Sequence, residues 1–177
     1  MSDDGAGLGE ILCEAARRDN TDLLEEVFGE ADDVAQLINT SRNPIGLSAI
    51  HLAAKYGALS ALDMLLDQPG VEVDPIEPIE GNTPLHLAVD AANTNPEEGT
   101  AAVELLVQAG SNIRIKNKHA QKPIDIAYPT SEGVRKILQD AEMAILLGSG
   151  PSAPPPPPPA AEGDDEDAGT PSESESD

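Results

Sequence analysis

The sequence predicts an all-α protein in which short helix pairs stack side by side as a solenoid. A block at 46–54 returns at 81–89, and a weaker third copy occupies 120–127. A second apolar stretch with helical spacing follows each copy, at 62–66, 103–110 and 134–138. A unit of about 35 residues with two short helices cannot bury its own apolar face, so such units stack on one another.

An N-terminal helix pair over residues 8–39 is expected to close the first end of the array. Two apolar stripes have helical spacing, and Asn20 and Thr21 between them supply an N-cap for the second helix. The stripes contain Leu8, Ile11, Leu12 and Ala15, then Leu23, Leu24, Val27 and Phe28.

Three repeat units follow, at 46–80, 81–119 and 120–147. In the second unit, Thr83 is placed to cap a helix, Pro84 suits the first helical position, and His86 can reach back to the cap. The third unit has Lys122 and Asp125 in place of the threonine and the histidine. We therefore expect the Thr–His pairing to be absent from the last unit.

The second unit has six more residues than the first between its block and its second helix. Residues 90–100 hold the difference, and Asn95 followed by Pro96 predicts a fresh helix start. We expect a longer loop between the two helices here. Such insertions often serve partner binding, but surface loops also lengthen at little cost in stability, so both interpretations stay open.

Residues 148–177 differ in composition from the rest and are predicted to form a disordered tail. The prolines at 154–159 favour an extended conformation. The residues that follow include eight acidic and no basic side chains. Thr170, Ser172 and Ser174 each have an acid three residues later, a pattern that acidophilic kinases favour, so we hypothesise phosphorylation there. A tail that only improves solubility is an equally good interpretation.

Composition argues against several classes of function. The 177 residues carry 33 acidic and 10 basic side chains, a formal charge of −23, which opposes binding to nucleic acid or to an anionic membrane surface. No apolar run reaches the roughly 20 residues of a membrane span, and the first residues lack a signal-peptide pattern. We expect a monomer in the cytoplasm, the nucleus or both.

The repeat unit resembles the ankyrin repeat, whose period is about 33 residues. The likeness rests on Thr-Pro-Leu-His-Leu-Ala at 83–88 and on Leu-Leu-Val-Gln-Ala-Gly-Ser-Asn at 105–112, and the repeat pattern extends over 8–147. The resemblance implies an ankyrin-repeat solenoid with β-hairpin fingers between repeats. It also implies a protein-binding scaffold rather than an enzyme.

No constellation of catalytic or metal-binding residues is recognisable in the sequence. His51 and His86 occupy the histidine position of the repeat, and no cysteine, serine or carboxylate stands at triad or metal-ligand spacing. We therefore assign both histidines a structural role. Cys13 is the single cysteine and is expected in the core. The sequence predicts no active site, no metal and no cofactor.

The resemblance places a partner-binding groove between the fingers and the first helices of the repeats. The residues expected to contact a partner are Arg42, Lys55, Tyr56, Ile79, Asn82, Arg114, Lys116, Lys118, His119 and Gln121. Four of the ten basic residues lie within 114–122, in one predicted finger. This finger is a polar hairpin, a site for an acidic partner segment, or a site for the protein's own tail. Either contact would weaken with salt.

Two functions fit these features. The first is a scaffold or adaptor that binds a protein partner through the groove and the fingers. The alternative is a dedicated chaperone of a highly basic client, such as a ribosomal or other nucleic-acid-binding protein, which the acidic body and tail would shield. The layout of few repeats with an acidic extension is similar to that of a small yeast ankyrin-repeat chaperone for a basic ribosomal protein.

Overall fold

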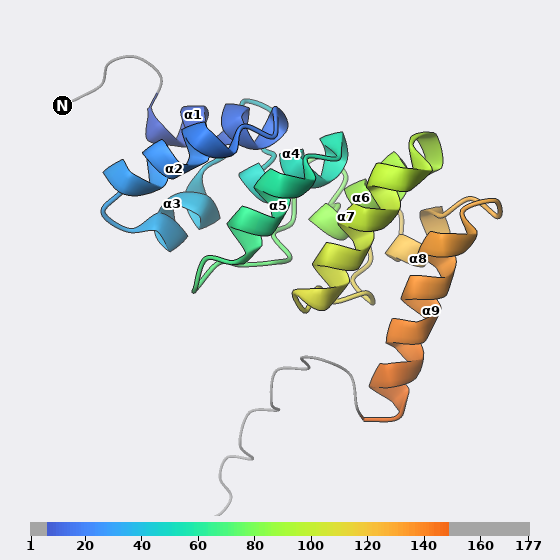
Figure 1. The fold of residues 1–177 in the computed structure, drawn as a ribbon. Helices are drawn as coiled ribbons and strands as arrows, with labels where there is room; N and C mark the ends of the chain where they lie inside the picture. The colour runs from blue at the N-terminus through green and yellow to red at the C-terminus, as the bar shows by residue number, and fades with distance from the viewer. Residues whose placement is uncertain (1–6, 149–177) are drawn as a thin grey trace, which may run out of the picture.

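The computed structural model describes residues 7–148, and the predictions of disorder and phosphorylation at 149–177 lie outside these residues. Within the described part, the helices are α1 (Leu8–Arg17), α2 (Thr21–Glu30), α3 (Val34–Thr40), α4 (Ala49–Tyr56), α5 (Leu59–Leu66), α6 (Pro84–Thr94), α7 (Pro96–Gln108), α8 (Pro123–Ile126) and α9 (Glu132–Leu146). The first helices of successive pairs stack together, and so do the second helices (Figure 1). The predicted all-α solenoid of stacked helix pairs is confirmed.

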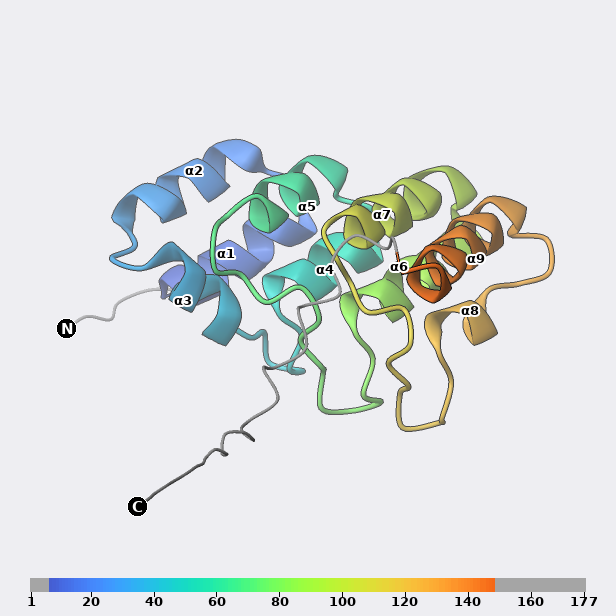
Figure 2. The same cartoon turned by 90° about the horizontal axis from the view of Figure 1, so that it is seen from below.

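The two layers bury one core that is continuous along the array. It includes Leu12 of α1, Ile50 of α4, Leu85 of α6 and Leu138 of α9, each at most 1% exposed. Figure 2 shows that the loops between successive pairs project to the same side of the array. Within residues 7–148, no helix combines the length and the apolar character needed to cross a membrane.

The N-terminal segment contains a third helix, α3, that the sequence analysis missed. The Asp33 side chain accepts a hydrogen bond from the Gln36 amide and caps this helix. Ile38 then packs into the core at 1% exposure. The Asn39 side chain donates to the Gly70 carbonyl (3.0 Å) and accepts from the Glu72 amide (2.7 Å). α3 therefore ties the N-terminal end to the loop of the following repeat.

The predicted caps at the starts of α4 and α6 are confirmed. The His51 Nδ1 atom accepts from the Ser48 amide (3.2 Å), and the Ser48 hydroxyl accepts from the His51 amide (3.3 Å). Thr83 and His86 repeat this geometry. Each of these first helices thus has both halves of a capping box.

The third unit lacks this pairing, as predicted from Lys122 and Asp125. The Asp125 carboxylate still accepts from the Lys122 amide (2.8 Å), so half of the cap survives. α8 is only four residues long, against 8 for α4 and 11 for α6. The first helix of the third unit is therefore the shortest in the array.

The expectation of a longer loop within 90–100 is wrong, because the extra residues lengthen both helices. The predicted start at Pro96 is confirmed, and Asn95 alone separates α6 from α7. α7 has 13 residues, whereas α5 has eight. A Cβ atom on Gly99 would lie 2.2 Å from the Cα atom of Ala92. This glycine lets the two backbones approach closely enough for the helices to stay packed over the added turn.

The added turn of α6 supports the third unit. The Asn93 side chain donates to the Ile126 carbonyl (3.0 Å) and accepts from the Tyr128 amide (2.9 Å) and the Ser131 hydroxyl (3.0 Å). These groups lie where α8 stops and the chain turns toward α9. The insertion therefore has a structural role: it satisfies backbone groups that the short α8 leaves without helical partners.

Candidate protein-binding surface

Three tight turns project between the repeats, and we call them finger 1 (43–47), finger 2 (77–82) and finger 3 (117–121). In each finger, the amide of the first residue donates to the carbonyl of the last. The distances are 2.9 Å for Asn43 to Leu47, 3.0 Å for Glu77 to Asn82 and 2.9 Å for Asn117 to Gln121. No strand is assigned in residues 7–148, so the predicted hairpins are present as turns.

One polar side chain organises each finger from within. Asn43 Oδ1 accepts from the amides of residues 45 and 47, and Asn117 Oδ1 accepts from those of residues 119 and 121. Finger 2 is one residue longer and has the longer Glu77 at this position. The Glu77 carboxylate accepts from the amides of Ile79 (2.6 Å), Glu80 (2.9 Å) and Asn82 (3.0 Å).

The sequence analysis missed these three side chains. A signal was available, since Asn43 and Asn117 each stand five residues before a helix N-cap and Glu77 stands six before one. Glu77 is 4% exposed. Burial raises the pKa of its carboxyl, but the hydrogen bonds from Asn82, Ile79 and Glu80 outweigh burial and hold the pKa below its usual value. The ionised carboxylate therefore fixes finger 2.

The three fingers pack against one another in a row. A Cβ on Gly46 would lie 2.5 Å from the Pro78 ring, and a Cβ on Gly81 would lie 3.0 Å from Lys118 Cγ. Both glycines have positive φ, 91° and 76°, so the turn geometry and the close contact each favour glycine. The fingers thus form one continuous edge, which we call the finger ridge.

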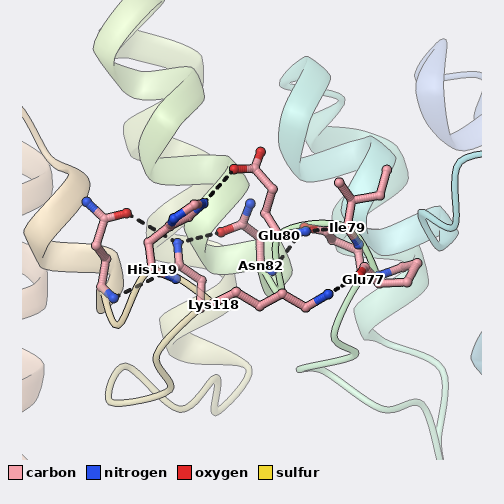
Figure 3. A network of polar contacts seen from close by, with 9 residues as sticks. Glu77, Ile79, Glu80, Asn82, Lys118 and His119 are labelled. Carbon is pink, nitrogen blue, oxygen red and sulfur yellow. Dashed lines mark hydrogen bonds and ion pairs between the residues drawn. The ribbon is translucent and has the colours of Figure 1, made fainter.

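Fingers 2 and 3 are also joined by polar contacts (Figure 3). The Lys118 amide donates to the Glu80 carbonyl (2.8 Å), and the Lys118 ammonium donates to the Pro78 carbonyl. His119 Nε2 lies 3.1 Å from Glu80 Oε1. Two of the predicted partner-binding bases, Lys118 and His119, therefore face the neighbouring acidic finger.

Asn82 and Gln121 make hydrogen bonds that hold the ridge together. Asn82 Oδ1 accepts from the Asn117 amide group (3.0 Å). The backbone carbonyls of Asn82 and Gln121 each accept from a histidine of the preceding repeat, His51 and His86, at 3.0 Å. These two predicted contact residues thus link successive repeats.

The tips of fingers 1 and 2 present isoleucines at the same position of the turn. Ile45 is 52% exposed and Ile79 is 62% exposed. Ile79 was predicted as a contact residue, whereas Ile45 was missed although each follows a proline at the same step of its finger. Because finger 1 packs on Pro78, the two isoleucines belong to one edge.

A small buried apolar cluster lies among the first helices, separate from the main core. It consists of Cys13, Leu47 and Leu52, with the half-buried Leu87 beside them. Tyr56 stands at the end of α4, 50% exposed, with Arg17 Cζ 5.7 Å and Lys55 Nζ 5.9 Å from its ring centre. A notch of about 290 Å³ opens between this end of α4 and the lengthened α6–α7 pair. The predicted Lys55 and Tyr56 therefore lie together.

The remaining predicted contact residues lie apart from these. Arg42 is exposed but donates to the carbonyls of Asn39 and Ser41, each at 2.8 Å, at the end of α3. Arg114 pairs with Glu142 of α9. Lys116 is exposed in the loop that leads to finger 3. The structure therefore divides the predicted set among the ridge, the end of α4 and the flanks.

Comparison with known proteins identifies the family of this array. Residues 12–117 match the ankyrin repeats family in three copies. The chain is 42% identical over 151 residues to the ankyrin repeat-containing protein YGL242C of Saccharomyces cerevisiae, covering 82% of this chain and 83% of that protein. The chain belongs to the ankyrin repeat family. Ankyrin repeats are protein–protein interaction modules.

Two more distant relatives of this ankyrin chain carry other names. It is 29% identical over 126 residues to the I-Kappa-B like protein H1 of a Microplitis demolitor bracovirus, covering 70% of this chain and 62% of that protein. It is 26% identical over 109 residues to zinc finger CCCH domain-containing protein 56 of Arabidopsis thaliana, covering 60% and 14%.

The histidines of the ankyrin motif are buried and neutral at pH 7. Burial lowers the pKa of His51 to about 4 and lowers the pKa of His86 as well. In each ring Nδ1 accepts from an amide, so the proton lies on Nε2, which donates to the next repeat. Both rings are therefore fully used by structural bonds. Burial also raises the pKa of the Cys13 thiol to about 11.

Charge is distributed unevenly along the ankyrin array. Residues 7–110 carry 19 acidic and four basic side chains, a net −15. Residues 111–148 carry four acidic and six basic side chains, a net +2. The surface from α1 to α7 therefore favours cations, and the end of the array favours anions.

Proposed function

We propose that this chain is a non-enzymatic adaptor that binds a protein partner through its finger ridge and the notch beside Tyr56. The proposal rests on one observation above all: Ile45 and Ile79 are more than half exposed on neighbouring fingers. Large exposed apolar side chains that lie on the same edge of an array are typical of an interaction site.

The rigidity of the fingers supports the proposal. Asn43 and Glu77 fix the backbone of each turn from within, and Gly46 packs finger 1 against finger 2. A surface that is ordered before binding loses less conformational entropy in the complex. At the far end of α4, Tyr56 and Arg17 supply two of the residue types most often found at the energetic centre of interfaces.

A basic client is a second candidate, and one observation favours it. Six exposed acids lie on α2 and the loop after it, and no basic residue occurs between Arg18 and Arg42. These acids are Asp22, Glu25, Glu26, Glu30, Asp32 and Asp33. A field of this sign attracts a cationic partner and accelerates its encounter with the array.

The adaptor proposal is tested by site-specific photocrosslinking in the native cell. A photoreactive amino acid is placed at Ile79 on the ridge, at Tyr56 in the notch, or at the exposed Glu104 of α7. We expect the same partner to be captured from residues 79 and 56 and not from residue 104. Capture from residue 104 alone would contradict the proposal.

Salt separates the two candidate functions. A strongly basic partner whose capture weakens between low and moderate salt supports the client function, because screening acts on exposed charges. A partner that is retained at moderate salt and lost on Ile79→Asp supports an adaptor that binds through apolar contacts.

A further inference from the structure

A cavity of about 410 Å³ opens at the C-terminal end of the array, between the two helices of the third unit. Its apolar wall includes Ile124 of α8 and Met143 and Leu146 of α9. Met143, Leu146 and Leu147 are 55%, 67% and 73% exposed. A further repeat would stack on this end in a longer array, and terminal repeats ordinarily present a polar face instead. Burying these exposed apolar side chains under another segment would therefore stabilise the end of the array.

The rim of this cavity lies in the part of the chain that carries net positive charge. Lys122 lines the cavity, and Glu142, which also lines it, is already paired with Arg114. The preceding residues 7–110 carry a net −15, whereas 111–148 carry a net +2. An acidic segment is therefore repelled by the part of the array from α1 to α7 and attracted to this end.

The chain itself continues from this end with a segment of suitable composition. Residues 149–161 are uncharged and rich in proline and alanine, and five acids follow within 162–167. Gly148 has φ of 74°, and its amide donates to the Ile145 carbonyl (3.1 Å), which is the left-handed turn that ends α9.

The reach of this segment suffices. Thirteen residues in polyproline conformation span about 40 Å, whereas the 15 residues of α9 span about 22 Å. A segment that returns along α9 therefore brings the acids at 162–167 within reach of the basic residues between Arg114 and Lys122.

We propose that residues 151–161 fold back over the apolar end of the array and that the acids at 162–167 contact the basic loop at 114–122. The tail then acts as a cap of the solenoid, in place of a polar terminal repeat. Covalent attachment gives the segment an effective concentration of about millimolar, so weak contacts are enough to hold it. The cap also hinders a second copy from stacking on this end.

The test uses the full chain with a nitroxide label in the tail. Cys13→Ala removes the native thiol, Ala160→Cys supplies the attachment point, and paramagnetic broadening is read on backbone amides. We expect strong broadening at 113, 124 and 138–146, and little at α1, α2 and α3. Broadening that is absent, or equally weak over the whole array, would overturn the proposal.

Variants separate docking from chance encounters. Met143→Ser together with Leu146→Ser should reduce the broadening several-fold, and replacing the acids at 162–167 by amides should reduce it further. Ile76→Ser is the matched control, since Ile76 is 57% exposed on the loop before finger 2, and it should leave the broadening unchanged. Equal effects of the α9 and the control variants would refute docking at this cavity.

A mixture distinguishes the chain's own tail from a second copy. Chain that carries the nitroxide but no ¹⁵N is mixed with ¹⁵N-enriched chain that carries no nitroxide. Docking within one molecule predicts no broadening in the mixture. If the mixture shows broadening as strong as that of a ¹⁵N chain with its own nitroxide, another copy covers this end, and the proposal is overturned.

Discussion

The first two repeats and the third solve the same packing problem with different side chains. His51 and His86 each complete the cap of their own helix and donate to the backbone of the next repeat. The third repeat has Asp125 at this position and makes only the cap. Asn93, on the added turn of α6, supplies three hydrogen bonds to it instead. A repeat that lacks its own coupling group is therefore held by an extension of its neighbour.

The largest expected effect is the difference in stability loss between a charge placed at the centre of the array and one placed at its end. Leu85→Asp places a charge at a fully buried position and should cost about 4 kcal/mol or more in the free energy of unfolding. Leu146→Asp, at a position 67% exposed, should leave most of the stability intact. Urea unfolding followed by circular dichroism measures both. Equal losses would show that the end of α9 belongs to the core.

Acid should destabilise the first two repeats through their histidines. The pKa of His51 is about 4 in the folded state and 6.5 in the unfolded state, so the unfolded chain binds more protons between these values. The stabilisation is complete above pH 6.5 and is lost as the pH falls toward 4. We expect a loss of about 2 kcal/mol by pH 5 and about 3 kcal/mol by pH 4 from this residue. His86 acts in the same direction.

The measurement is the urea midpoint of the wild-type protein and of His51→Gln at pH 7 and pH 5. The variant is less stable at pH 7, but its dependence on pH over this range should be weaker. A variant with the full wild-type dependence would place the responsible proton elsewhere. The range above pH 5 keeps most carboxyl titrations out of the comparison.

Asn93→Ala tests the bond between the second repeat and the third. Removing this side chain leaves the Ile126 carbonyl and the Tyr128 amide without their partner and should cost about 1–3 kcal/mol. Amide hydrogen exchange should accelerate at 123–131 and stay unchanged in α1 and α4. Asn95→Ala is the control, because Asn95 is exposed and caps α7 with no side-chain hydrogen bond. Uniform acceleration along the chain would contradict the local role.

The smallest effect is expected at the ion pair between Arg114 and Glu142. Both side chains are more than a third exposed, and exposed pairs contribute little because solvent and salt screen them. Arg114→Ala should leave the unfolding midpoint within experimental error at moderate salt. A clear loss would indicate that the loop before finger 3 depends on this pair.

Local signals made much of the fold predictable from sequence. Thr83 and Pro84 mark a helix start by their own chemistry, and Pro96 does the same for α7. α3 has a cap residue in Asp33, but its seven residues bury only Ile38, so no apolar stripe marked this segment as a helix. The form of the insertion was equally hidden, because it depends on Gly99 lying against Ala92, a contact between two helices.

The candidate surface was predictable only in part. Ile79 and Tyr56 were recognised as exposed groups of a repeat. Lys118 and His119 were predicted to contact a partner. Their contacts with Glu80 were not predicted, because these depend on how adjacent fingers align. Interactions within one turn, such as those of Glu77, are easier to predict from sequence than contacts between turns.

The histidine bonds give the array a mechanical polarity. Each runs forward, from His51 to the second repeat and from His86 to the third, and the third repeat sends none onward. When tension is applied to the two ends of residues 7–148, α8 and α9 should detach first, because α8 has only four residues and α9 fully buries only Val134 and Leu138. Peeling should then proceed toward α1 one repeat at a time, so that the N-terminal repeats keep their shape longest under load.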